Sequence, residues 1–189
     1  MYNIGTDLYY VPSQGAAFLT NGTVGYLQFG ADGRYTSGNA ELDEYVSKEL
    51  AACTDSSMTR EQKLRAAYVY IRDHAKYLAR DHHPRGDTSW TEESALFFLK
   101  NHRGNCYCFA GTFLYMSRQL GYQSYPISGG VGHANSDHAW VMIPSSSGVD
   151  YIYDVELEYA YRYRYSPTKN LNLYRMSPSN TVFIYHFPK

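Results

Sequence analysis

Two cysteines, a histidine and an aspartate are the residues of this sequence whose types and settings suit covalent chemistry. Cys106 and Cys108 stand one residue apart in the stretch GNCYCFAG, after a glycine and before a long apolar run. His138 begins the apolar stretch HAWVMI, and Asp154 interrupts the apolar stretch YIYDV. A thiolate is a nucleophile, an imidazole can serve as its base, and a third polar group can orient that base. The four residues therefore point to nucleophilic catalysis.

The expected setting of Cys106 favours its ionised form. A helix is predicted to start close to Cys106 and to end at Gly121, a natural C-terminal cap. Its apolar positions recur at helical spacing: Phe109, Phe113, Met116 and Leu120. The free N–H groups and partial positive charge at a helix start stabilise a thiolate, and the same N–H groups can bind an oxyanion.

Helices precede strands along the rest of the chain, which predicts an α+β fold with an antiparallel sheet. Three earlier helices are expected: one capped by Asn39 and running to Cys53, one opened by a Thr59–Gln62 capping box with an apolar stripe to Leu78, and one that begins at Ser89. Four strands are expected later: Tyr125–Val131, His138–Ile143, Tyr151–Leu157 and Thr181–Tyr185. In this arrangement Asp154 lies inside the strand after that of His138.

Residues 1–39 differ in composition from the rest, being rich in Gly, Tyr, Thr and Asn. Gly5-Thr6 recurs as Gly22-Thr23, and Asp32-Gly33 is a turn signal. A short repeat of aromatic residues and turns suggests stacked β-hairpins. We therefore expect two units, a β-hairpin segment over 1–39 and a catalytic domain over 40–189.

The composition excludes several classes of function. The 189 residues carry a net charge of −1, which favours neither nucleic acid nor an anionic membrane as a partner. No apolar run is long enough to cross a bilayer, and three cysteines cannot form a disulfide framework. The first residues, MYNIGTDLYY, have no basic start and no apolar core, so no signal peptide is expected in this stretch.

The ordered motifs resemble the transglutaminase-like superfamily, whose core is similar to papain-like cysteine proteases. The motifs in question are Gly104 to Ala110 (GNCYCFA), Leu120-Gly121, Gly129-Gly130, Asp137 to Trp140 (DHAW) and Tyr153-Asp154. The resemblance implies that Cys106 is the nucleophile, His138 the base and Asp154 the acid that orients it. Cys108 falls at a variable position of that pattern. Flanking β domains and a calcium loop, which animal members of this superfamily possess, are not expected here.

The N-terminal segment resembles, more loosely, the tyrosine- and glycine-rich cell-wall-binding repeats of Gram-positive surface proteins. Gly25-Tyr26-Leu27, Asp32-Gly33 and Ser37-Gly38 carry this resemblance. It implies that the natural protein is extracellular or at the cell surface and that this chain is a fragment of it.

Several alternatives remain open on the sequence. Cys106 and Cys108 with His133 or His138 would supply three zinc ligands, although zinc sites usually space paired cysteines further apart. His133 is a rival base, in a Gly- and Asn-rich stretch, and Asp150 is a rival acid beside an expected turn. Tyr70 and Tyr77 are candidates to line the cleft or to donate to an oxyanion, and Trp140 is expected to pack against the catalytic helix. A non-catalytic cell-wall or glycan-binding module on the same fold is the rival function.

The expected reaction is acyl transfer from an amide through a thioester on Cys106. His138 protonates the departing amine or ammonia, and water or a second amine resolves the thioester. The expected partners are a peptide or protein amide and, by the second resemblance, a cell-wall component. No metal or organic cofactor is required.

Overall fold

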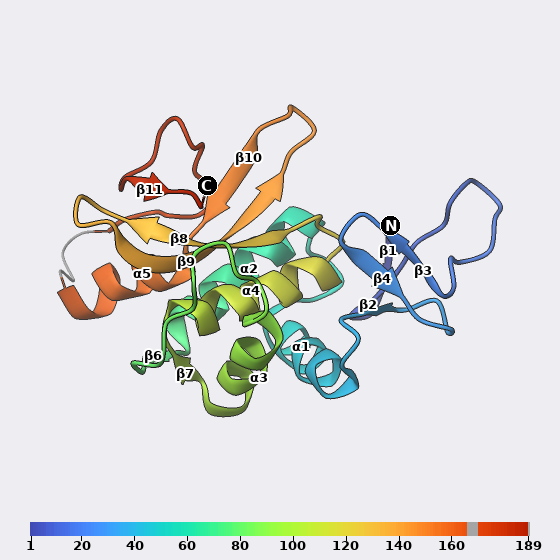
Figure 1. Ribbon diagram of the computed structural model, residues 1–189. Coiled ribbons are helices and arrows are strands. Elements are labelled where there is room, and N and C mark those ends of the chain that lie inside the picture. The colour runs from blue at the N-terminus through green and yellow to red at the C-terminus, as the bar shows by residue number, and fades with distance from the viewer. Residues whose placement is uncertain (166–169, 189) are drawn as a thin grey trace.

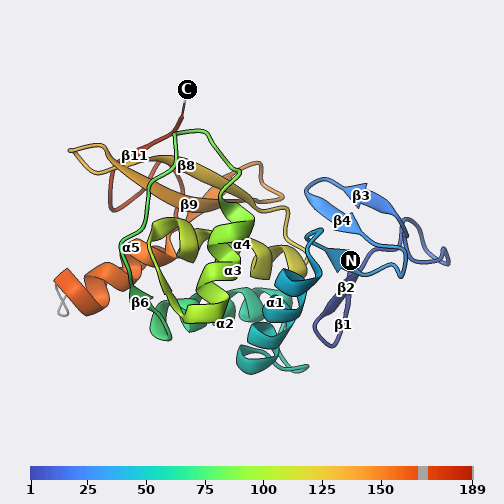
Figure 2. The ribbon, with the colours of Figure 1, turned by 60° about the horizontal axis from the view of Figure 1, so that its bottom comes forward.

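The structure, a computed structural model, describes residues 1–165 and 170–188 and confirms the α+β class. The helices are α1 (Ala40–Cys53), α2 (Arg60–Asp73), α3 (Thr91–Asn101), α4 (Cys106–Gln119) and α5 (Val155–Ala160), which the π-helical turn η1 (Tyr161–Tyr165) continues. They lie on one side of a four-stranded sheet (Figures 1 and 2). The two predicted N-terminal caps are confirmed: Asn39 accepts from the Leu42 N–H, and Thr59 forms its capping box with Gln62.

The main sheet is antiparallel throughout, with strand order β10-β9-β8-β11. Its strands are β8 (Tyr125–Val131), β9 (Ser136–Pro144), β10 (Asp150–Tyr153) and β11 (Tyr185–His186). The register of β8 and β9 sets Gly129 opposite His138. A short parallel pair, β6 (Lys76–Tyr77) with β7 (Arg103–Gly104), leads into the start of α4.

Helix α4 is the centre of the core, since all but one of its residues are buried. It packs against α3 so closely that a Cβ on Gly111 would lie 2.8 Å from the Thr91 carbonyl oxygen. It also packs against β9, whose Ala139, Val141 and Ile143 join the same hydrophobic cluster. A helix buried on every side can carry apolar residues all round, and most residues of α4 are apolar.

The expectation that Trp140 packs against this helix is wrong. Successive side chains of a strand point to opposite faces, so Trp140 and Met142 lie on the face opposite to that of Ala139 and Val141. There they form a second cluster with Ile152, Leu173 and Met176. The Trp140 ring also contacts Tyr185 of β11, with 5.0 Å between ring centroids. Trp140 therefore anchors the C-terminal segment to the sheet.

Four predicted boundaries move. Helix α2 ends at Asp73 because the chain then pairs as β6, and α3 begins at Thr91 rather than at Ser89. The predicted strand 181–185 contains only the start of β11. The predicted strand 151–157 ends at Tyr153, after which Asp154 caps helix α5 through its own side chain. Asp154 thus lies at a strand-to-helix junction and not inside a strand.

Two hairpins and one further strand make up the N-terminal segment. The strands are β1 (Tyr2–Ile4), β2 (Asp7–Tyr9), β3 (Gly22–Val24), β4 (Leu27–Phe29) and β5 (Tyr35–Thr36). The hairpin turns fall at Gly5 and Gly25, both with positive φ. The structural repeat therefore matches Gly5 with Gly25, whereas the sequence comparison matched it with Gly22. Turn geometry sets this register, because only the turn requires a left-handed residue.

The N-terminal segment has its own small cluster of buried side chains: Leu8, Leu27, Phe29 and Tyr35. It sits at the far end of α4 from Cys106 (Figure 1). Two glutamines hold it there. Gln119 donates to the Thr6 carbonyl at 2.9 Å, and Gln123 accepts from the Tyr26 N–H at 2.8 Å. The proposed division at residue 39 stays a prediction, while these contacts show that the two parts touch.

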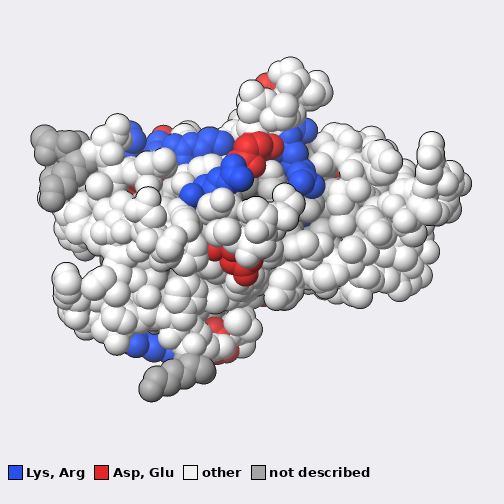
Figure 3. Space-filling model, turned by 90° about the horizontal axis from the view of Figure 1, so that it is seen from above, with Lys and Arg blue, Asp and Glu red and all other residues white. Residues whose placement is uncertain are grey.

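Charged side chains are sparse on the surface that Figure 3 shows, where Lys and Arg gather in one strip with Asp or Glu among them. This agrees with a sequence in which only 19% of residues are charged. Among the described residues, no helix is both long and apolar enough to cross a membrane.

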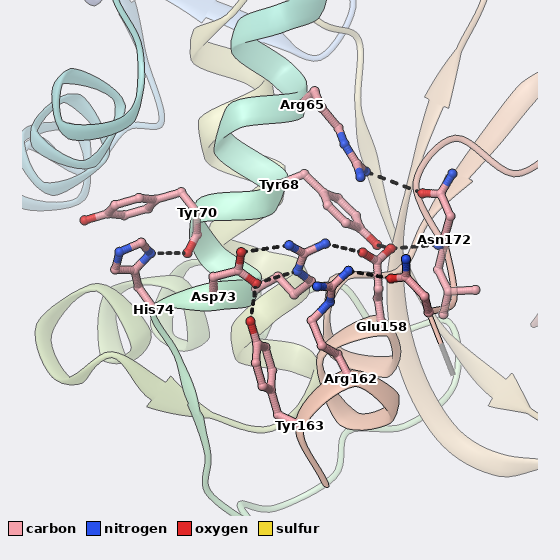
Figure 4. Close-up of polar contacts among 12 residues, drawn as sticks. Arg65, Tyr68, Tyr70, Asp73, His74, Glu158, Arg162, Tyr163 and Asn172 are labelled. Atoms are coloured by element: carbon pink, nitrogen blue, oxygen red, sulfur yellow. Dashed lines mark hydrogen bonds and ion pairs between the residues drawn. The ribbon is translucent and has the colours of Figure 1, made fainter. Parts of the chain in front are cut away.

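A buried ion pair ties α2 to α5 (Figure 4). Arg72 contacts Glu158 at 2.5 Å, and their side chains are 6% and 1% exposed. Glu158 also accepts from the Leu173 N–H, and the Tyr68 hydroxyl lies within hydrogen-bond distance of both Glu158 and the Asp154 carbonyl oxygen. A buried carboxylate needs such partners to offset its lost hydration. The network therefore fixes the helix that Asp154 caps.

Replacing Arg72 by Ala is expected to lower the free energy of unfolding by about 3–5 kcal/mol, because it leaves the Glu158 carboxylate buried without its cation. Chemical denaturation measures this. The control is Arg34→Ala, which removes exposed ion pairs to Asp32 and Asp7 and should change stability little. Equal effects of the two substitutions would contradict the importance of the buried pair.

Candidate active site

Cys106 is the first residue of α4 and is 6% exposed. The two residues before it place it there. Gly104 ends β7, and a Cβ at this position would lie 2.3 Å from the Cβ of Cys108, so only glycine allows the chain to turn so tightly into the helix. This close contact explains why residue 104, the first of the GNCYC stretch, is a glycine.

Asn105 stands at the N-cap of α4 but does not cap it with its side chain. Its Nδ2 instead donates to the carbonyl oxygens of Arg80 and Asp81, each at 3.2 Å. The Asn105 carbonyl accepts from the N–H groups of Cys108 and Phe109. The first N–H groups of a helix have no partner within it. The side chain that would normally satisfy them is used to hold a loop, so this end of the helix remains available to an anion.

His138 and Asp154 form a buried pair beside this helix end. The His138 Nε2 lies 2.8 Å from the Asp154 Oδ2, and the two residues are 4% and 1% exposed. The Tyr185 hydroxyl donates to the same oxygen at 2.8 Å, while the Leu157 N–H donates to Oδ1 at 3.0 Å. Both carboxylate oxygens are therefore satisfied, which keeps the carboxylate in one orientation.

The charges around His138 favour its protonated form. Burial alone would lower the imidazole pKa, but the charge and hydrogen bond of Asp154, followed by a hydrogen bond with Cys106, raise the pKa well above its usual value. The structure thus brings Cys106, His138 and Asp154 together from α4, β9 and the start of α5. Such an arrangement suits a thiolate–imidazolium pair.

A second carboxyl group faces the other nitrogen of the ring. Glu156 Oε2 lies 4.0 Å from His138 Nδ1, and the Glu156 side chain is 9% exposed. Burial raises the pKa of Glu156 to about 7, although the nearby His138 opposes this effect. Burial raises the pKa of Tyr77 of β6, and the charges of Glu156 and Cys106 add to this effect.

The rival residues lie elsewhere. His133 is exposed in the turn between β8 and β9, and Asp150 accepts a hydrogen bond from Tyr125. Cys108 Sγ lies 3.6 Å from the Arg80 guanidinium, an unsuitable neighbour for a metal ion. Over residues 1–165 and 170–188, no three His, Cys, Asp or Glu side chains are grouped to hold a metal. Tyr70 stacks on His74, whereas the charge of Cys106 acts on Tyr77.

Three neighbours of the predicted triad were missed on the sequence: Asn105, Glu156 and Tyr185. Asn105 had a weak signal, because an Asn just before a predicted helix is a typical cap. Glu156 also had a weak signal, because it is an acidic residue two positions after Asp154 in an apolar stretch. Tyr185 had none, since its contact joins residues 31 positions apart that only the fold brings together.

A hollow of about 360 Å³ adjoins the start of α4. Its lining is polar and comprises Arg80, Asp81, His83, Glu93, Ser94 and Asn105. A larger hollow of about 710 Å³ lies between the N-terminal segment and α1, at the other end of α4. The smaller hollow is the more relevant to chemistry at Cys106, because Asn105, the residue just before Cys106, lines it.

Comparison with known proteins identifies a family. Residues 47–149 match the family model of the transglutaminase-like superfamily. A solved structure described as a crystal structure of a TGase is 17% identical in sequence, with a TM-score of 0.46, and the match covers 60% of this chain. The chain spans 31% of the length of that structure. No curated protein matches the chain.

Replacing Asp154 by Asn is expected to lower the pKa of His138, because the charge that holds the proton on the imidazole is lost. An NMR titration of the imidazole C–H signals measures this. In the wild type the imidazolium stabilises the fold fully below the imidazole's usual pKa, and that stability is lost as pH rises through the raised pKa. Asp150→Asn, which changes the rival acid, is the control and should leave His138 unaffected.

Replacing Glu156 by Gln is expected to change the pH dependence of stability. A carboxyl whose pKa is about 7 in the folded state, against an ordinary value of 4.5, resists ionisation in the folded protein, so the wild type loses stability as pH rises between those values. Relative to the wild type, the free energy of unfolding of the Gln variant should increase over this range by an amount on the order of 3 kcal/mol. Denaturation at pH 4 and pH 8 tests this, and a constant difference would contradict it.

Proposed function

Because this chain belongs to the transglutaminase-like superfamily, we propose that it is a cysteine-dependent enzyme that transfers an acyl group from an amide. Cysteine-dependent acyl transfer is the chemistry of the superfamily, and its members are generally enzymes. Cys106 is proposed as the nucleophile, His138 as the base and Asp154 as the acid that orients His138. The observation that carries the proposal is the buried His138–Asp154 pair next to a cysteine at a helix start.

The first half of the proposed reaction forms a thioester. The Cys106 thiolate attacks the carbonyl carbon of a peptide or protein carboxamide, and the carbonyl oxygen becomes an oxyanion. When the C–N bond breaks, the His138 imidazolium gives its proton to the departing nitrogen, which leaves as ammonia or an amine. His138 is then neutral, while Asp154 and Tyr185 keep its ring in place.

The proposed oxyanion donors are the backbone N–H groups at the start of α4. Their availability follows from Asn105, whose side chain holds residues 80 and 81 instead of capping the helix. Donors fixed by the fold need no reorganisation when charge develops on the oxygen, which is why such sites contribute strongly to catalysis.

The N-terminal segment is proposed to bind a component of a Gram-positive cell wall, with the natural protein extracellular or at the cell surface. Exposed aromatic side chains, including Tyr2, Phe18 and Tyr26, provide surfaces on which sugars can stack. Binding of purified cell walls by the chain, compared with a Tyr26→Ala variant, tests this. The rival reading of the whole chain as a non-catalytic module is not favoured, since acyl transfer is the chemistry of the family.

Cys106→Ala is expected to abolish covalent labelling, while Cys108→Ala is expected to retain it. Intact-mass spectrometry after incubation with a p-nitrophenyl ester measures the acyl-enzyme, and the rate of iodoacetamide alkylation at neutral pH gives an independent readout. Cys106 hydrogen-bonds to His138, whereas burial raises the pKa of the Cys108 thiol. Equally slow alkylation of Cys53, Cys106 and Cys108 would contradict the assignment of Cys106 as the nucleophile.

A further inference from the structure

The hollow of about 710 Å³ at the far end of α4 from Cys106 has no part in the reaction proposed above. Its walls come from the N-terminal segment, from α1 and from Gln119, the last residue of α4. The hollow therefore exists only because the N-terminal segment docks on the helices. Its size is that of a site for a small organic ligand.

Acidic side chains dominate the charge of this hollow. Its described lining contains four carboxylates and a single guanidinium, those of Asp7, Asp32, Asp43, Glu44 and Arg34. Arg34 bonds to Asp32 at 2.7 Å and approaches Asp7 at 3.6 Å, so two carboxylates share this cation. The excess negative charge favours a cationic ligand over a neutral or anionic one.

The carboxylates that α1 contributes differ in how far they are already engaged. Asp43 accepts from the Thr36 hydroxyl through one oxygen and from the Ser37 N–H through the other, which ties the start of α1 to the N-terminal segment. Glu44 is exposed and lines the same hollow. Its carboxylate can therefore meet a ligand directly.

An unsatisfied acceptor lies in the wall of the hollow. Gln119 is 4% exposed, and its Nε2 donates to the Thr6 carbonyl at 2.9 Å and to the Ser47 hydroxyl at 2.7 Å. All three residues belong to the lining. Among the described residues the Gln119 Oε1 is buried and has no hydrogen-bond partner. Such an oxygen is costly to bury, and an N–H or O–H of a bound ligand would satisfy it.

The lining selects among cations by their hydrogen-bond donors. A quaternary ammonium has no N–H to donate and is bound by aromatic faces, whereas the aromatic residue of this described lining, Tyr35, is buried. A primary ammonium has three N–H donors, and each hydroxyl adds another. A sugar that carries a free amine combines the charge with these donors.

We propose that this hollow binds an amino sugar whose amine is not acetylated, with the ammonium held by the carboxylates of the lining and Glu44 foremost among them. The ring hydroxyls donate to the remaining acceptors, including Gln119 Oε1. The site is independent of the chemistry proposed at Cys106. Its lining also differs from the exposed aromatic residues to which cell-wall binding is assigned above.

The test compares two disaccharides that differ in charge. The whole chain is titrated by calorimetry at pH 6 with the disaccharide of glucosamine, whose free amines are then protonated, and with its neutral N-acetylated form. The free-amine disaccharide is expected to bind at least about tenfold more tightly, and its affinity should fall as salt is added. Tetramethylammonium, a cation without N–H groups, should not displace it.

Glu44→Gln is expected to weaken binding of the free-amine disaccharide by about fivefold or more, because an unscreened attraction is lost. The matched control is Glu41→Gln, a neighbouring exposed residue of α1 outside the lining, which should leave the affinity unchanged. Equal affinity for the two disaccharides, displacement by tetramethylammonium, or equal losses in the two variants would overturn the inference. None of these results would bear on acyl transfer at Cys106, which covalent labelling tests separately.

Discussion

The complete hydrogen bonding of one buried carboxylate, that of Asp154, is the constraint on which the rest of the site depends. One oxygen accepts from His138 and Tyr185, and the other caps helix α5. Its backbone carbonyl is within reach of the Tyr68 hydroxyl of α2. Since an ionised group this deeply buried is tolerated only with such partners, the sheet, two helices and the C-terminal strand must all meet at this residue.

The start of α4 has no side-chain cap, which lowers stability but leaves backbone N–H groups free to bind an anion. A helix end buried in the core usually has a side-chain cap, and Asn105 is the residue type best suited to supply one. Here its amide instead fixes the loop after β6. The free N–H groups that result are a liability for stability and an asset for binding an anion, a conflict that is common where chemistry is carried out.

Electrostatics separates the two carboxyl groups that flank His138. The Asp154 carboxylate has three hydrogen-bonding partners, His138, Tyr185 and Leu157, whereas the Glu156 carboxylate lies 4.0 Å from the imidazole ring. A pair of acids in unlike settings can take unlike roles, one that stays charged and orients the imidazole, and one that exchanges protons near neutral pH.

Local signals in the sequence determined the α+β class, the Asn39 and Thr59 caps, strand β8 to the residue and the start of α4 at Cys106. Periodicity and capping act over a few residues, so they can be read without the fold. Only the tertiary structure decided that Asp154 follows a strand and caps a helix, that Trp140 faces away from α4, that Tyr185 bonds to Asp154 and that Glu156 lies beside His138. These contacts join segments far apart in the chain, and a single sequence carries no record of which distant segments pack together.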